Sequence, residues 1–353
     1  MNLIVANDDD LTRIPYTPQY FELKIPINFP KMEIPSDNPI TTEGVELGRR
    51  LFYDPILSRD SSISCGSCHA PNLAFTDGKA VSTGIDGKIG VRSAMSLENV
   101  GFITHGLFWD GRVKTLEEQA LLPIEDPVEM HHTWGEVEEK LQKHRDYPNR
   151  FRRAFGISTK KEITKTLAVK ALAQFERTLI SGNSPYDRIT SFTDFSDDAF
   201  DGYKMFMDAG GPDAHCSHCH APPFFNARDF FNNGLDSVNS LDDFRDKGLG
   251  ALTKKRVDNG KFRATSLRNI AFSAPYMHDG RFKTLEEVVE HYTSKSHYAD
   301  NVDPFIPDIK IKKFTERQKK QLVIFLKTLS DTSFYKIPHF AIHFCNSCCV
   351  ILF

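Results

Sequence analysis

The sequence has 353 residues, which is enough for two domains of ordinary size. Its 44 basic and 47 acidic residues leave a net charge of −3, so the composition gives no reason to expect binding to nucleic acid or to an acidic membrane surface. No run of about 18 apolar residues occurs, so no transmembrane helix is expected.

The N-terminal region does not have a helical pattern. The chain begins without the basic segment and the long apolar segment of a complete signal peptide. Residues 14–40 are rich in Pro and Ile, and we expect residues 1–40 to form an extended arm. The first predicted helix follows directly, over Thr42–Tyr53.

The next element is a short motif, Cys65-Gly66-Ser67-Cys68-His69, and the second half of the chain repeats its pattern as Cys216-Ser217-His218-Cys219-His220. Both motifs are followed by Ala-Pro. The pattern Cys-x-x-Cys-His attaches c-type haem. Its two sulfurs form thioethers with the porphyrin edge, and its histidine binds the iron. The sequence therefore predicts two covalently bound haem c groups, with His69 and His220 as iron ligands.

Each Cys-x-x-Cys pair has other interpretations: half of a zinc site, a redox dithiol or a disulfide. Zinc would not require a histidine directly after each second cysteine, and a thioredoxin-type dithiol expects βαβ surroundings that this sequence lacks. Three further cysteines have no following histidine and do not form a third haem site, namely Cys345, Cys348 and Cys349. They belong to a tail, residues 333–353, whose role the sequence does not explain.

The two halves of the chain follow one plan. The stretch SLENVGF at 96–102 matches SLRNIAF at 266–272, and DGRVKTLEE at 110–118 matches DGRFKTLEE at 279–287. In both copies the Thr-x-x-Glu sequence is a capping box, which predicts a helix directly after each DGR loop.

Three more helices are predicted, over 161–180, over 196–207 and after Thr315-x-x-Gln318, each with an apolar stripe that we interpret as core packing. No alternating strand pattern of useful length occurs. We therefore expect an all-α fold of two small helical haem domains related by an internal repeat, residues 41–184 and 185–332. The Ser181–Pro185 segment is the expected boundary.

When the two repeats are aligned on DGR, the residues near the two haems differ, so the haems are not expected to be equivalent. Met277 falls opposite Phe108, and His278 falls opposite Trp109. A methionine thioether is a common sixth ligand of c-type haem, whereas phenylalanine cannot bind iron. We predict that His220 and Met277 ligate the second haem, which suits electron transfer, and that the first haem keeps an open iron site for a small oxidant. Core filling is the alternative role of Met277.

Three other residues lie near the first haem in sequence. Trp109 fits core packing or an electron relay between the haems, and Gln119 lies one turn into the helix after the first DGR. Glu129 follows that helix, where a carboxylate can move the proton that peroxide must shift between its oxygens. A surface charge is the alternative for Glu129.

The order of these motifs resembles the bacterial di-haem cytochrome c peroxidases and the related MauG-like proteins, over residues 40 to 330. The resemblance implies two cytochrome c-like domains, a peroxidatic haem on His69 and an electron-entry haem on His220 and Met277. It further implies that Trp109 lies between the haems and that Gln119 and Glu129 line the distal pocket. Hydrogen peroxide would be the substrate, with a small cytochrome c or copper protein as electron donor. The family often binds calcium between its domains, and a homodimer is a further expectation.

The sequence departs from many of these peroxidases at one position. They carry a histidine that blocks the first iron until the second is reduced, and here Ile85 occupies that neighbourhood. Either the first haem is permanently open or another histidine blocks it, with His105, His131 and His132 as candidates. The loop Ala74-Phe75-Thr76-Asp77-Gly78 resembles the MauG-like branch, which lacks that histidine, whereas Met277 stands where MauG has tyrosine.

The favoured function is therefore reduction of hydrogen peroxide to water. The alternatives are a MauG-like enzyme that oxidises a protein or an organic substrate, and a di-haem electron carrier without enzyme activity. Because c-type haem is attached outside the cytoplasm, we expect a periplasmic protein whose leader is absent from this sequence.

Overall fold

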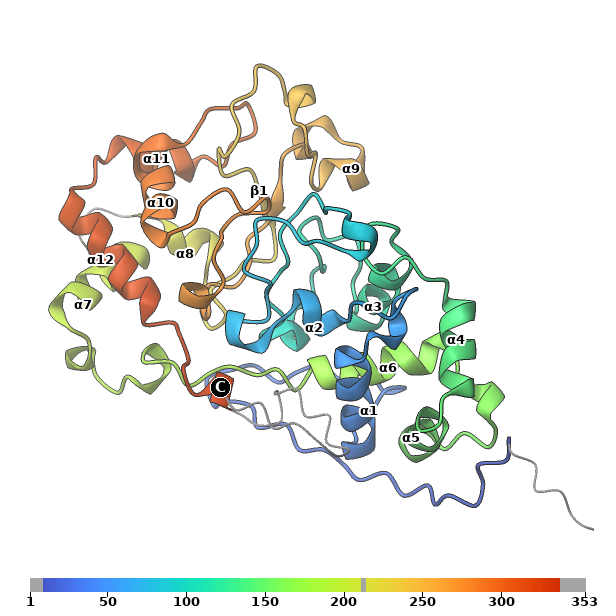
Figure 1. The fold of residues 1–353 in the computed structure, drawn as a ribbon. Helices are drawn as coiled ribbons and strands as arrows, with labels where there is room; N and C mark the ends of the chain where they lie inside the picture. The colour runs from blue at the N-terminus through green and yellow to red at the C-terminus, as the bar shows by residue number, and fades with distance from the viewer. Residues whose placement is uncertain (1–8, 211–213, 337–353) are drawn as a thin grey trace, which may run out of the picture.

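The computed structural model describes residues 9–210 and 214–336. Within these ranges the chain forms two helix-rich halves that lie side by side, one drawn in blue to green and the other in yellow to red (Figure 1). No helix among them combines the length and apolar character needed to cross a bilayer. Most of the unexplained tail, from residue 337 on, lies outside the described residues, together with Cys345, Cys348 and Cys349.

The N-terminal half has its core around two helices, α1 and α6, that pack against each other. Its helices are α1 (Thr42–Tyr53), α2 (Cys65–Cys68), α3 (Leu116–Glu125), α4 (Trp134–Lys143), α5 (Tyr147–Phe155) and α6 (Lys165–Glu176). Helix α3 also packs on α6, which brings the segment after the first DGR onto the core.

The C-terminal half is built around the pair α7 and α12. Its helices are α7 (Asp197–Phe206), α8 (Cys216–Cys219), α9 (Gly250–Thr253), α10 (Leu285–Glu290), α11 (Phe305–Ile311) and α12 (Glu316–Lys327). A turn of π-helix, His291–Lys295, continues α10. The strands β1 (Phe230–Phe231) and β2 (Phe262–Arg263) pair antiparallel, with Phe230 opposite Arg263.

The helices predicted from the sequence are present, with one difference in length. Helix α1 has the predicted bounds, and the capping boxes at Thr115, Thr284 and Thr315 are all formed. The helix predicted over 161–180 is shorter because Thr159 and Glu162 form their own capping box around a 3-10 turn. The α-helix then begins at Lys165 and ends at Glu176.

The two-stranded sheet was not predicted, so the fold is helix-rich and not purely α-helical among the described residues. Each strand has only two residues, which is too short for an alternating pattern to appear in the sequence. Residues 9–41 contain no helix. Phe29 of the arm contacts Phe102 of one half and Phe224 of the other, with ring centroids 5.6 and 4.7 Å apart.

The central helix pairs of both halves approach closely at a glycine. A side chain at Gly48 of α1 would place its Cβ 1.9 Å from the carbonyl oxygen of Ala171 in α6. A side chain at Gly202 of α7 would place its Cβ 2.1 Å from the carbonyl oxygen of Gln321 in α12. Only glycine allows backbones to come this near, so the same packing device occurs once in each half.

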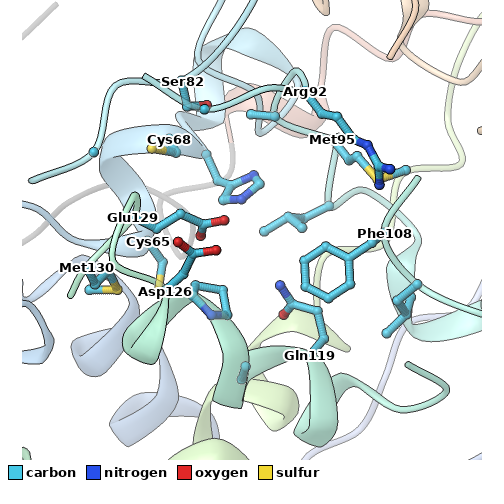
Figure 2. Close-up of a pocket in the computed structure, with 18 of the residues that line it drawn as sticks. Cys65, Cys68, Ser82, Arg92, Met95, Phe108, Gln119, Asp126, Glu129 and Met130 are labelled. Atoms are coloured by element: carbon cyan, nitrogen blue, oxygen red, sulfur yellow. The ribbon is translucent and has the colours of Figure 1, made fainter. Parts of the chain in front are cut away.

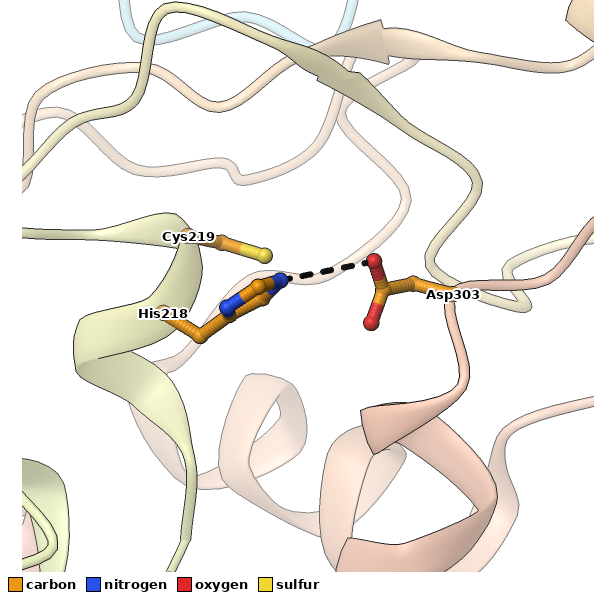
Figure 3. Close-up of side chains that lie close together, drawn as sticks. All are labelled: His218, Cys219 and Asp303. Atoms are coloured by element: carbon orange, nitrogen blue, oxygen red, sulfur yellow. Dashed lines mark ion pairs between the residues drawn. The ribbon is translucent and has the colours of Figure 1, made fainter.

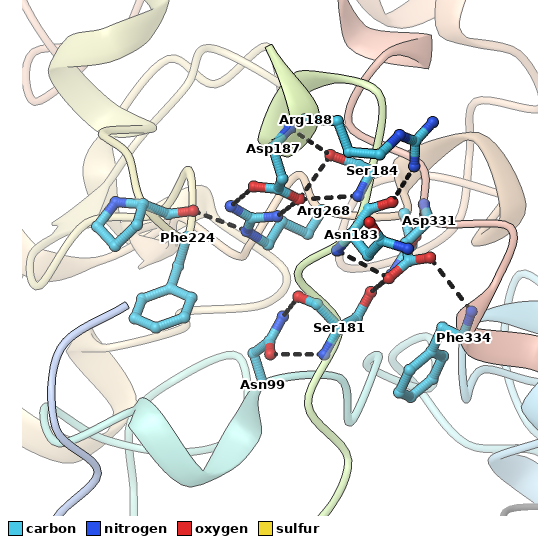
Figure 4. Close-up of polar contacts among 12 residues, drawn as sticks. Asn99, Ser181, Asn183, Ser184, Asp187, Arg188, Phe224, Arg268, Asp331 and Phe334 are labelled. Atoms are coloured by element: carbon cyan, nitrogen blue, oxygen red, sulfur yellow. Dashed lines mark hydrogen bonds and ion pairs between the residues drawn. The ribbon is translucent and has the colours of Figure 1, made fainter. Parts of the chain in front are cut away.

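A polar network joins the halves at the segment that links them (Figure 4). Asn99 exchanges two hydrogen bonds with the backbone of Ser181, at 2.9 and 3.0 Å. The carboxylate of Asp331 accepts hydrogen bonds from Ser181 and from the backbone of Asn183, and Arg268 forms a buried bidentate pair with Asp187. The link between the halves is thus held by groups from both of them.

Candidate functional site

The first Cys-x-x-Cys-His motif forms the short helix α2, and His69 is the C-cap residue that follows its last residue, Cys68. Nδ1 of His69 lies 2.8 Å from the carbonyl oxygen of Phe75, which engages that nitrogen and leaves Nε2 for a metal. Burial lowers the pKa of His69, which favours the neutral imidazole that binds iron. The local chain therefore prepares His69 as a ligand.

The second motif repeats this arrangement on α8. Nδ1 of His220 lies 3.0 Å from the carbonyl oxygen of Phe225 and 3.1 Å from that of Thr265. Burial again lowers the pKa of the imidazole. Two carbonyl groups thus fix the ring orientation of His220, as one carbonyl group does for His69.

Each motif lines a cavity. Cys65, Cys68 and His69 line a cavity of about 430 Å³ in the N-terminal half. The corresponding residues of the second motif line a cavity of about 240 Å³ in the C-terminal half. Two thiols and one oriented imidazole at the wall of a cavity are the donor set that covalent haem requires. The residues present therefore fit one haem c in each cavity.

Three residues that the sequence analysis singled out share the first cavity. Phe108, Gln119 and Glu129 all line it, and Figure 2 shows them around the same space. Phe108 has a positive φ of 63°, and the guanidinium of Arg112 covers its ring at 3.5 Å from the centroid. A phenyl ring offers no iron ligand at this place.

A second carboxyl group, which the sequence did not single out, joins Glu129 in this cavity. Figure 2 shows Asp126 and Glu129 directed into it from the segment after α3. The pKa of Glu129 is raised to about 7, mainly by burial and also by the negative charge of Asp126, while Arg112 opposes the rise. A carboxyl group with this pKa exchanges a proton readily at neutral pH.

Met277 and the motif histidine His220 both line the second cavity. Met277 has a positive φ of 75°, as Phe108 does at the equivalent place in the first half. The side-chain amide of Asn233 lies 3.5 Å from the sulfur of Met277 and 3.1 Å from the hydroxyl of Tyr292. Sequence reasoning missed Asn233, because it stands 44 residues before Met277 and outside any motif.

The chain is similar to several known proteins. The family described as di-haem cytochrome c peroxidase matches residues 42–193. The methylamine utilization protein MauG of Methylorubrum extorquens is 35% identical, over 84% of this chain and 80% of that protein. Cytochrome c551 peroxidase of Pseudomonas aeruginosa is 37% identical, over 71% of this chain and 72% of that protein.

The chain belongs to the di-haem cytochrome c peroxidase family. A solved structure, a MauG-like protein associated with microbial copper homeostasis, matches this member of the family with a TM-score of 0.83 and 32% identity. The match covers 91% of this chain and 99% of that one. This di-haem peroxidase family member is therefore a haem-dependent oxidoreductase of the peroxidase type.

The candidates for a blocking histidine in this family member do not line the first cavity. His131 lies 2.9 Å from a guanidinium nitrogen of Arg59, and His132 lies 3.3 Å from the carboxylate of Glu136. His105 is also absent from the lining. Ile85 is buried, and its backbone donates a hydrogen bond to the carbonyl oxygen of Glu129. His69 is thus the one histidine among the described residues that line this cavity.

Trp109 of this di-haem peroxidase family member lies in the wall between the cavities and lines both of them. Its indole nitrogen donates a hydrogen bond of 2.9 Å to the carbonyl oxygen of Ser93. The hydroxyl of Ser93 donates in turn to the carbonyl oxygen of Met277, also at 2.9 Å. This chain of bonds connects the tryptophan with the backbone of the predicted second-haem ligand.

A third grouping of metal-binding side chains lies beside the second motif (Figure 3). It consists of His218, Cys219 and Asp303, and Nε2 of His218 lies 3.7 Å from the Asp303 carboxylate. Cys219 is one of the two cysteines that the haem motif requires, so the grouping belongs to the second haem site of this family member.

Proposed function

We propose that this chain is a periplasmic peroxidase that reduces hydrogen peroxide to water with electrons from a small cytochrome c or copper protein. The first cavity would take peroxide and the second would take up electrons. One contrast carries the proposal. The first cavity has the carboxyl group of Glu129, and it has Phe108 at the place in the repeat that Met277 takes in the second cavity.

The reaction consumes one hydrogen peroxide, two protons and two electrons and yields two water molecules. Haem c, held by the thioethers of each motif and by His69 or His220, would supply the iron at which peroxide and electrons meet. The protein supplies orientation, proton transfer and a route between the cavities.

Glu129 would move the proton. Its carboxylate accepts the proton from one oxygen of peroxide and returns it to the other, which then departs as water. The raised pKa of Glu129, about 7, suits both transfers. Gln119 would orient peroxide through its side-chain amide, and Phe108 keeps the space free of a competing ligand.

Trp109 would serve as the relay through which electrons cross between the cavities, since it lines both. Met277 would be the sixth ligand that gives the second haem a high reduction potential. The hydrogen bond from Asn233 to its sulfur supports this role, because it holds the thioether in one orientation.

We also propose that residues 41–184 and 185–332 are two cytochrome c-like domains derived from one repeat. Several matched features support this. Both halves place a glycine at the crossing of their central helices and a capping box after DGR. The asparagines of the SLxN stretches, Asn99 and Asn269, both have a positive φ. Calcium between the halves and a homodimer stay predictions from the family, without assigned residues.

A second function is favoured by one observation. Ile85 stands where many of these peroxidases have the blocking histidine, and this resembles the MauG-like branch. Such an enzyme would oxidise a protein or an organic substrate and turn over poorly with a cytochrome donor. Met277 favours the peroxidase. The electron-carrier alternative is not favoured, because Phe108, which cannot bind iron, lines the first cavity at the place that Met277 takes in the second half.

The test is peroxide-dependent oxidation of a reduced small cytochrome c by the protein carrying both haems. The reaction is started once from the fully oxidised and once from the half-reduced protein. Fast turnover from both states is expected if the first iron is always open. Turnover only after reduction would keep the peroxidase function but indicate a hidden ligand. No turnover from either state would contradict the proposal.

A further inference from the structure

Arg263 lies deep in the wall that separates the two cavities. It belongs to β2, and its backbone N–H donates a hydrogen bond of 2.9 Å to the carbonyl oxygen of Trp109. Its side chain lines the first cavity and the second one. Only 7% of the residue is exposed. Arg263 therefore borders both haem sites from a position that water hardly reaches.

The charge of Arg263 has no carboxylate partner among the described residues. Its Nη1 donates to the carbonyl oxygen of Gly106 at 2.7 Å, and its Nη2 lies 3.9 Å from the sulfur of Met95. Its Nε is buried without any hydrogen-bond partner. Burial lowers the pKa of Arg263 to about 10, so the group is still a cation at neutral pH.

Other arginines of the molecule show what a buried guanidinium normally has. Arg268, only 3% exposed, forms a bidentate pair with Asp187. The two other arginines that line the first cavity also have carboxylates: Arg92 bonds Asp110 and Asp246, and Arg112 bonds Asp110. A buried charge that lacks such a partner is strongly destabilising. Arg263 therefore needs an anion that the described chain does not supply.

We infer that Arg263 is the shared counter-ion of the propionate groups of both haems. This rests on the haem occupancy within the proposed function. Each haem c carries two propionates, which are ionised at neutral pH and which the cysteines and histidines of the motifs do not neutralise. A guanidinium offers five N–H donors in one plane, and it can bind a carboxylate through two parallel hydrogen bonds. Arg263 is also the one arginine or lysine among the described residues that line the second cavity.

A shared cation has an electrostatic consequence for both irons. Uncompensated propionate charge stabilises the oxidised iron, because that state is one unit more positive than the reduced state. Removal of Arg263 should therefore shift both midpoint potentials to more negative values at once. A cation that served one haem would shift only one of them.

The experiment is a redox titration of the Arg263→Gln protein with both haems attached, in the absence of peroxide. The matched control is Arg256→Gln, which removes the same charge from an exposed site that lines neither cavity. We expect both potentials to fall in Arg263→Gln and neither to change in the control. The propionate bands in the resonance Raman spectrum should also shift. Unchanged potentials, or a fall confined to one haem, would overturn the inference.

If the glutamine variant does not retain both haems, Arg263→Lys tests the shared counter-ion role instead. An ammonium keeps the charge but lacks the fork, so it cannot bond the propionates of both haems at once. At least one potential should then fall. Two unchanged potentials would refute the shared role. Because the titration needs no peroxide, a protein without peroxidase turnover but with both shifts would keep this inference and contradict the proposed function.

Discussion

The rings of Trp109 and His278 lie edge to face across the wall between the cavities, with centroids 6.4 Å apart. The two residues stand at equivalent places in the two halves, each directly before a DGR sequence. His278 also stacks on Phe262 at 3.7 Å. Aromatic rings are thus in contact from the neighbour of Met277 to the neighbour of Phe108, which is the path that electrons would need.

Trp109→Phe should slow electron transfer between the haems by about tenfold or more, because phenylalanine is harder to oxidise and lacks the indole N–H bond to Ser93. Stopped-flow reduction of the first haem by the second measures this rate. The control is Trp134→Phe on α4, a buried tryptophan that lines neither cavity. Equal rates of electron transfer in the wild type and in Trp109→Phe would show that Trp109 is not the relay.

Met277→Leu should convert the second haem from low-spin to high-spin iron and lower its potential, because leucine cannot bind the metal. The matched variant is Asn233→Leu, which keeps the ligand but removes the hydrogen bond to its sulfur. It should stay low-spin with a changed potential. The absorption spectrum and a redox titration report both effects. A wild-type spectrum in Met277→Leu would rule out this ligand.

Glu129→Gln should slow peroxide turnover by about 10²- to 10⁴-fold, because glutamine cannot accept and return a proton. In the wild type the rate should rise as pH increases through about 7, since the ionised carboxylate begins the transfer. The variant should lose this rise. Glu125→Gln, an exposed neighbour at the end of α3, is the control. If Glu129→Gln carries both haems and keeps full activity, Glu129 is not the group that transfers the proton.

Glu98 makes the stability of the folded protein depend on pH. It is buried and accepts hydrogen bonds from Asn269 and Tyr335, and burial raises its pKa from 4.5 to about 8. Between these values the folded state binds one proton more than the unfolded state, so the free energy of unfolding decreases as pH rises. The decrease is on the order of 5 kcal/mol, since each pKa unit corresponds to ~1.4 kcal/mol.

The variant Glu98→Gln should lose this pH dependence, because glutamine is neutral throughout. Its amide oxygen still accepts from Asn269, and its amide N–H can donate to the hydroxyl of Tyr335. Chemical denaturation at several pH values between 4.5 and 8 measures the difference. The slope of stability against pH should be flatter in the variant. Parallel curves for the two proteins would mean that Glu98 does not carry the raised pKa.

Much of the architecture follows from local sequence signals. The capping boxes at Thr115, Thr284 and Thr315 act between residues three apart, so they are visible without any knowledge of the fold. The two haem motifs are equally local, and the repeat aligns Met277 with Phe108. The bounds of α6 were less accurate, because a second capping box at Thr159 competes for the same segment.

The sequence by itself determined the two haem motifs, the helix starts and the inequivalence of the two halves, because these depend on neighbours along the chain. Only the tertiary structure decided which distant groups meet. Asn233 reaches the sulfur of Met277, and Asp126 shares a cavity with Glu129. Arg263 is buried between both cavities without a carboxylate among the described residues. Burial and unpaired charge are properties of packing, and no local pattern encodes them.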